Sequence, residues 1–97
     1  MTVPAELRLS ALRAFLGRIH PEMRRIAVAM QGSEIVVTVT VDRPPSARVV
    51  EDVSEAATEI VADFLAPVTI REQIDVVTGP LPSEDIFERG LLYERAE

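Results

Sequence analysis

Cysteine is absent from this chain, so it can form neither a disulfide framework nor a metal site with thiolate ligands. No apolar stretch approaches the roughly 20 residues that a membrane-spanning helix requires. The N-terminal residues also lack the basic start and apolar run of a secretory signal peptide. Together these absences predict a protein that resides in a reducing cytoplasm.

Residues that carry catalytic chemistry are also scarce. His20 is the only histidine, and no local pattern supplies the acid or nucleophile that a catalytic histidine needs within hydrogen-bonding reach. We therefore interpret His20 as a loop residue that helps to satisfy the end of the preceding helix. The four glycines are scattered and form no phosphate-binding loop. The sequence predicts no catalytic residue, no metal site, no cofactor and no enzymatic activity.

The chain does contain enough apolar material for one core. Hydrophobic residues make up 47% of its 97 residues, which argues against disorder, and this length suits a single domain over residues 1–97. The formal net charge is −6. Such a charge argues against binding to nucleic acid or to an anionic membrane, because both would repel the chain.

The first predicted helix covers residues 4–18, because a proline suits the first helical turn and Gly17 and Pro21 mark the end. Four apolar residues follow helical spacing and are predicted to form its buried face, with Phe15 beside them. These four residues are Leu9, Leu12, Leu16 and Ile19.

Two strands are predicted next, over residues 25–30 and 34–42, joined by a tight turn at Gly32. The second strand alternates cleanly between apolar residues and smaller or polar ones. One of its faces is predicted to be buried, and it carries Ile35, Val37, Val39 and Val41.

The second predicted helix spans residues 46–66, with Ser46 as its N-cap and Pro67 after its end. Its buried residues recur at helical spacing. They are predicted to be Val49, Val53, Ala57, Ile60 and Phe64.

A third strand is predicted over residues 68–77, a helical turn over 83–88 and a last short strand over 91–95. The inward residues of the third strand are predicted to be Ile70, Ile74 and Val76. The order α-β-β-α-β-β predicts an α+β two-layer sandwich, with two helices on one side of a mostly antiparallel sheet of three or four strands. Its core is predicted to unite Leu12, Leu16, Val37, Val39, Ile60, Phe64 and Ile74.

A row of carboxylates runs along the second helix. Its members are Glu51, Glu55, Glu59 and Asp63, with Asp52 beside the first. Residues four apart are neighbours on a helix surface, and like charges at that spacing cost about 0.2–0.5 kcal/mol per pair. No basic residue lies between positions 49 and 70 to relieve this cost. The row is predicted to lie roughly opposite the buried face and to bind a basic protein partner.

A solvated acidic face without a partner is the alternative interpretation, because acidic surface also aids solubility. Arg43, Arg48 and Arg71 lie near enough in the sequence to pair with this helix and soften the repulsion. The apolar residues are interpreted as core and not as a ligand pocket.

Three segments resemble a family of small, acidic bacterial immunity proteins of toxin–immunity systems, both colicin-like and contact-dependent. The segment 58–64 (TEIVADF) is similar to a helix motif of that family and matches it at Glu59, Asp63 and Phe64. The segment 21–24 (PEMR) before the hairpin and a proline-bearing loop before the last strand are also similar. The resemblance implies a protein that binds and inhibits a toxin.

The residues and the resemblance together favour an immunity or antitoxin-like protein that inhibits a cognate toxin domain, a nuclease, through the acidic helix. A nuclease needs a basic cleft for the phosphate backbone, and an acidic inhibitor can cover that cleft. The alternative is a non-catalytic accessory or structural domain that forms a homodimer. Its contact would be a strand edge, and the valine-rich segment 35–41 is the candidate if it lies at the edge of the sheet.

Overall fold

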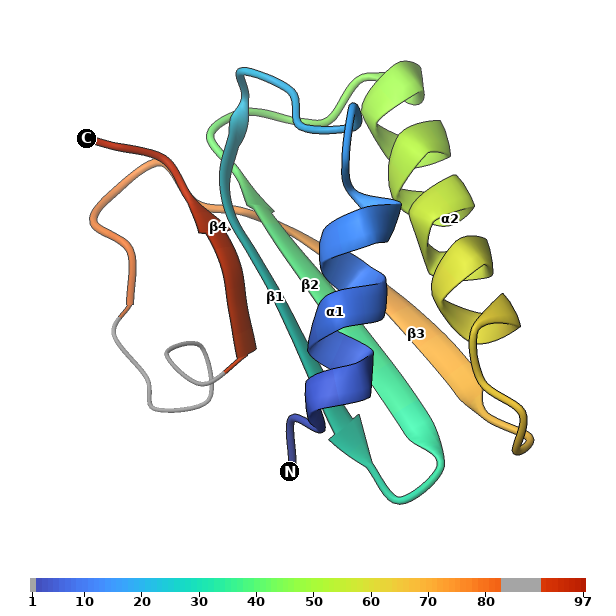
Figure 1. Cartoon of the computed structure of the whole chain (residues 1–97). Helices are drawn as coiled ribbons and strands as arrows, with labels where there is room; N and C mark the ends of the chain where they lie inside the picture. The colour runs from blue at the N-terminus through green and yellow to red at the C-terminus, as the bar shows by residue number, and fades with distance from the viewer. Residues whose placement is uncertain (1, 83–89) are drawn as a thin grey trace.

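The computed structural model describes residues 2–82 and 90–97, and two helices cover one face of a four-stranded sheet (Figure 1). The elements follow one another as α1 (Ala5–Ala14), β1 (Met23–Gln31), β2 (Glu34–Val41), α2 (Ala47–Ala62), β3 (Thr69–Val76) and β4 (Leu91–Glu94). This order and the two-layer α+β arrangement confirm the predicted fold class.

The strands lie in the order β3-β2-β1-β4. β1 pairs antiparallel with both β2 and β4, whereas β3 pairs parallel with β2, so the sheet is mixed. The parallel pair follows from α2, because a helical crossover returns the chain to the end of the sheet from which β2 started. β2 therefore lies inside the sheet. The idea that segment 35–41 offers a free edge for self-association is wrong.

The β1–β2 hairpin forms the centre of the core. Gly32 in its turn has a φ of +59°, a value that glycine adopts without steric cost. The four alternating residues of β2 predicted to be buried are all fully buried: Ile35, Val37, Val39 and Val41. On β3, Ile70 and Ile74 pack against this core as predicted. Val76 is 47% exposed, contrary to the prediction, because it ends an edge strand with a neighbour on only one side.

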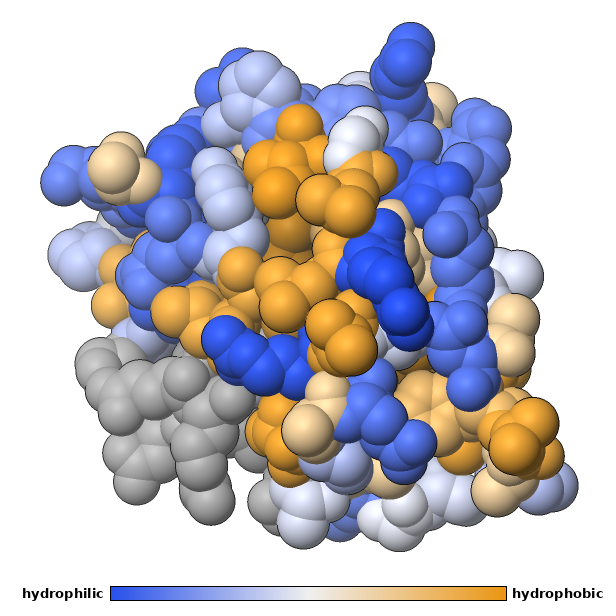
Figure 2. All heavy atoms as spheres, in the orientation of Figure 1, coloured by the Kyte–Doolittle hydropathy of each residue, from blue (hydrophilic) through white to orange (hydrophobic). Residues whose placement is uncertain are grey.

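α1 turns a different face to the core from the one predicted. Its buried residues are Leu7, Ser10, Ala11 and Ala14, followed by Phe15. The residues predicted to be buried are exposed instead, by 56%, 40%, 75% and 47% for Leu9, Leu12, Leu16 and Ile19. Figure 2 shows apolar side chains gathered on the outer surface over α1. Both sets of residues have helical spacing, and the smaller residues face inward because they allow α1 to approach the layer beneath it closely.

α1 also ends earlier than predicted. Its last residue is Ala14, and Gly17 follows with a φ of +78°, which turns the chain away from the helix axis. Leu16 therefore lies in the turn after the helix, and Ile19 lies beyond it.

β4 confirms the predicted last strand and lies at the edge beside β1. Gly90 precedes β4 and lies against β1 so closely that a Cβ atom there would be 2.0 Å from the carbonyl oxygen of Val28. Any larger residue would push β4 away from β1. The helical turn predicted over residues 83–88 lies outside the described residues.

Candidate partner-binding surface

α2 carries the predicted acidic row and begins as the sequence indicates. The Ser46 hydroxyl accepts a hydrogen bond from the Val49 N–H at 3.2 Å, which satisfies one of the free N–H groups of the first turn. The buried residues of α2 are Val49, Val53, Ala56, Ala57 and Ile60. The helix ends at Ala62, earlier than predicted, so Asp63 is its C-cap residue. Phe64 lies just beyond the helix and packs against the core from a half-buried position.

The carboxylates of this row do not lie opposite the buried face along its whole length. The row consists of Glu51, Asp52, Glu55, Glu59 and Asp63, which we call the acidic face. All of them except Glu51 contact a residue of α1 or of the loop that follows it. The acidic face therefore runs from the exposed side of α2 to the flank that meets α1.

Arg18, from the turn after α1, holds two of these carboxylates. Its Nη1 atom lies 2.5 Å from Glu59 Oε2, and its Nη2 atom lies 3.4 Å from Glu55 Oε2. Partial burial lowers the pKa of Arg18, but the hydrogen bonds to Glu59 and Glu55 raise that pKa above its ordinary value. Arg18 also donates to the carbonyl oxygen of Ala14 at 2.7 Å. The residue that satisfies the end of α1 is thus Arg18 and not His20, which corrects the role predicted for His20.

His20 instead contacts α2. Its Nε2 atom lies 2.6 Å from Asp52 Oδ2, and the two side chains are only 19% and 21% exposed. This contact holds the loop between α1 and β1 against the first half of α2.

Asp63 makes the equivalent contact at the other end of the helix. Its Oδ2 atom accepts a hydrogen bond from the Ser10 hydroxyl of α1 at 2.6 Å. Arg13 also approaches Asp63, at 3.5 Å. Both side chains of that second pair are largely exposed, so solvent screens it and it contributes little to stability.

The basic residues that contact the acidic face are not those expected from the sequence. Arg43 pairs with Asp42 at 2.6 Å, and Arg71 pairs with Glu34 at 3.6 Å, so neither folds back on α2. Arg48 lies at a shallow hollow shared with residues of the acidic face.

Arg13 and Arg18 were missed because they are distant from α2 in sequence. They approach it only after α1 and α2 pack together on the sheet. No local spacing could have indicated these pairs. The carboxylates nonetheless outnumber the arginines that contact them, so the acidic face keeps an excess of negative charge.

A family model described as MafI2 immunity protein matches residues 4–97, which includes every element of the fold. The chain belongs to the MafI2 immunity protein family. This membership confirms the resemblance to immunity proteins, and it implies a toxin as the partner. No curated protein matches the chain.

The described part of this MafI2 family member offers no obvious site for a metal. In residues 2–82 and 90–97, no three histidine, aspartate or glutamate side chains gather closely enough to hold an ion. Over the same residues, neither helix has the length and apolar character needed to cross a bilayer.

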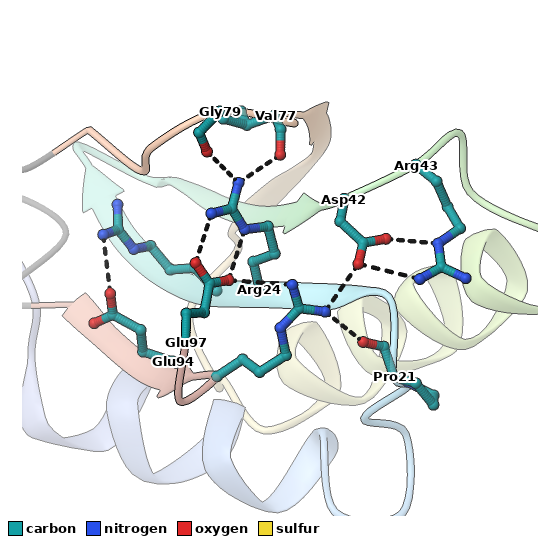
Figure 3. A network of polar contacts seen from close by, with 10 residues as sticks. Pro21, Arg24, Asp42, Arg43, Val77, Gly79, Glu94 and Glu97 are labelled. Carbon is teal, nitrogen blue, oxygen red and sulfur yellow. Dashed lines mark hydrogen bonds and ion pairs between the residues drawn. The ribbon is translucent and has the colours of Figure 1, made fainter.

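A second polar cluster of the MafI2 family member joins its C-terminal residues to the sheet (Figure 3). The Arg24 guanidinium donates to both carboxylate oxygens of Glu97, at 2.7 and 2.6 Å. It also donates to the carbonyl oxygens of Val77 and Gly79, each at 2.6 Å. The hydrogen bonds from Arg24 lower the pKa of Glu97 to about 2, and Arg95 contributes a smaller lowering. The cluster thereby fixes the chain after β3 and the chain after β4 to β1.

Arg95 extends this cluster toward the loop before β1. It donates to Asp42 at 2.9 Å and to the carbonyl oxygen of Pro21 at 2.8 Å. Hydrogen bonds from Arg43 and, to a smaller extent, from Arg95 hold the pKa of Asp42 well below its usual range. This cluster lies apart from the acidic face and has a structural role, because its charges are paired with one another.

Proposed function

We propose that this MafI2 immunity protein neutralises a cognate bacterial toxin domain, a nuclease, by binding it through the acidic face of α2. The excess negative charge of that face is the observation that carries the proposal. A nuclease presents a basic surface to the phosphate backbone. An acidic protein that covers this surface gains from complementary electrostatic fields, which speed association and select the partner. Such an inhibitor requires no catalytic residue or cofactor.

The members of the acidic face have different parts in this proposal. Glu51 is exposed, and no described residue pairs with it, so it is free to contact the toxin. Glu55 and Glu59 are each about half exposed while they hold Arg18, so their outer oxygens remain accessible. Asp52 and Asp63 are engaged by His20 and Ser10, and they position α2 against α1.

The test compares two charge reversals of the same size on different surfaces. Glu51→Arg changes the acidic face, whereas Glu72→Arg changes exposed β3, where Glu72 likewise has no described partner. Both variants should stay folded. Against the cognate toxin domain, Glu51→Arg should weaken binding about tenfold, equivalent to about 1.4 kcal/mol, and Glu72→Arg much less. Titration calorimetry and inhibition of nuclease activity would measure both effects.

Equal losses for the two variants would mean that only the net charge of the chain matters. No loss for Glu51→Arg would remove the acidic face from the interface. A double variant, Glu55→Gln with Glu59→Gln, extends the test because glutamine still accepts hydrogen bonds from Arg18 but carries no charge. It should slow association without unfolding the chain.

A further inference from the structure

α1 carries apolar residues on both its inner and its outer side, although it lies on the surface of the molecule. Its inner side carries Leu7, Ala11 and Ala14, all of them buried. Its outer side carries Leu9 and Leu12 and leads into Leu16. The helix also carries the charged residues Glu6, Arg8 and Arg13, but its outer leucines lie together and have no partner in the described chain. The outer side of α1 therefore has the character of a surface that becomes buried in a complex.

The exposed apolar residues of α1 and the turn after it form one patch. Leu9, Leu12, Leu16 and Ile19 make up this apolar patch, which occupies the centre of the face shown in Figure 2. The other large exposed hydrophobic residues among those described are scattered: Val50, Leu65 and Val76. Single exposed apolar side chains are ordinary, whereas a contiguous patch marks a binding surface.

A small pocket opens beside the apolar patch, between α1 and β4. Its volume is about 100 Å³, and its lining is almost entirely apolar. The lining residues are Leu12, Phe15, Leu16, Ile19, Ile26, Leu92 and Tyr93. An apolar cavity of about 150 Å³ holds benzene, so this smaller pocket is suited to a single aliphatic side chain. Such an anchor in a fitted pocket is the usual energetic centre of a protein interface.

The net negative charge of the chain favours a basic protein as the partner that fills this pocket. The apolar patch and the acidic face lie on the two sides of α1, because Arg18 and Ser10 join α1 to the carboxylates of α2. A second copy of the chain would bring another net charge of −6 against this surface and would be repelled. A basic partner would instead be attracted by the net negative charge of the chain, and on the α2 side of the patch it would meet the carboxylates of the acidic face beside Arg13 and Arg18.

We propose that the apolar patch and its pocket receive one aliphatic side chain that projects from the basic surface of the cognate toxin domain. This inference rests on the proposed function and adds an anchoring site to it. The acidic face then guides the toxin toward the immunity protein, while the pocket slows its departure. Tyr93 supports this role, because a tyrosine at the edge of an apolar pocket offers both a ring for packing and a hydroxyl for a polar contact.

The first experiment substitutes one leucine within the patch and one outside it. Leu16 is 75% exposed and Leu65, after α2, is fully exposed, so neither Leu16→Asp nor Leu65→Asp should disturb folding. Each adds one negative charge, which favours a basic partner, so any loss of affinity reports a lost apolar contact. We expect Leu16→Asp to weaken binding to the purified toxin domain by about 10- to 30-fold, mainly through faster dissociation. Leu65→Asp should bind as the wild type does.

The absence of cysteine allows a second readout that leaves the partner unchanged. Leu16→Cys creates a unique thiol in the patch, and Leu65→Cys creates one outside it. Bound toxin should slow alkylation of the first thiol about tenfold or more, as expected for burial in an interface, and leave the second unaffected.

Each other outcome overturns the inference in a recognisable way. Wild-type affinity for Leu16→Asp, with Leu16→Cys still reactive in the complex, would overturn the anchoring site and leave the proposed function standing. Failure of the wild type to bind the toxin domain would overturn both. Sedimentation of the free protein as a dimer that Leu16→Asp dissociates, with unchanged toxin affinity, would show that the patch serves a second copy instead.

Discussion

Among single residues, Glu97 has the clearest link between ionisation and folding. Its pKa falls from an ordinary 4.5 to about 2, chiefly because Arg24 donates hydrogen bonds to it. A lowered pKa means that the folded state favours the ionised carboxylate, so Glu97 stabilises the fold fully above pH 4.5. This contribution is lost as the pH falls toward about 2. Asp42 acts with the same sign, since its pKa is also lowered.

We therefore expect Glu97→Gln to lower the free energy of unfolding at neutral pH. The difference from the wild type should shrink as the pH falls below the ordinary glutamate pKa of 4.5. Urea unfolding followed by circular dichroism over a pH series measures this. Glu72→Gln is the control, because Glu72 is exposed and has no described partner. Parallel curves for Glu97→Gln and the wild type would contradict the prediction.

His20 supplies a second prediction for a single residue. His20→Ala removes the contact with Asp52 and leaves that carboxylate in a largely buried place without its partner. We expect a loss of about 1 kcal/mol in the free energy of unfolding, and toxin binding close to that of the wild type. Urea unfolding and a binding titration would check the two parts. Loss of protection against the toxin with an intact fold would instead point to a catalytic or contact role for His20.

At the scale of elements, the two helices differ in how well their sequences predict their orientation. α2 has one apolar stripe and one charged side, so only one orientation buries the stripe and leaves the charges near water. α1 has apolar residues on both sides, and two orientations satisfy the same periodicity. Leu7, Ala11 and Ala14 face inward because the small residues among them bring α1 close to its neighbours, and Ser10 then reaches Asp63.

The N-cap of α2 gives a prediction for this element. Ser46→Ala removes the acceptor of the Val49 N–H hydrogen bond and should lower the free energy of unfolding by about 1 kcal/mol. Ser54→Ala is the matched control, because Ser54 is exposed within the same helix and alanine is the better helix former. It should be neutral or slightly stabilising. Urea unfolding measures the free energy of unfolding of both variants. Equal changes in that free energy would mean that the cap contributes nothing.

At the scale of the whole molecule, the net charge of −6 predicts how the protein meets its toxin. Association with a basic domain should slow as salt rises, because the screening length falls from about 30 Å at 0.01 M salt to about 8 Å at 0.15 M. Dissociation should change much less if the apolar patch anchors the complex. Stopped-flow measurements of both rates across these salt concentrations provide the test. A flat association rate would show that electrostatic steering has no part in binding.

The predicted sequence of elements, the N-cap at Ser46 and the buried face of β2 agree with the structure, since all three depend on local spacing. The predictions that failed depended on neighbours that are distant in sequence. Val76 is exposed because β3 lies at an edge, and segment 35–41 is interior because β3 and β1 flank it. The ion pairs of Arg18 with the acidic face also depend on residues distant in sequence, because they form only after the two helices pack together.

The sequence by itself determined the α+β class, the order of its elements and the position of the acidic row on α2, because helical and strand periodicity and capping act over a few residues. Tertiary structure decided which side of α1 meets the core, and so which leucines remain at the surface. It also decided which arginines neutralise part of the acidic face. The physical reason is that these outcomes depend on packing and charge pairing between α1 and α2, whose contacts are set by their common position on the sheet.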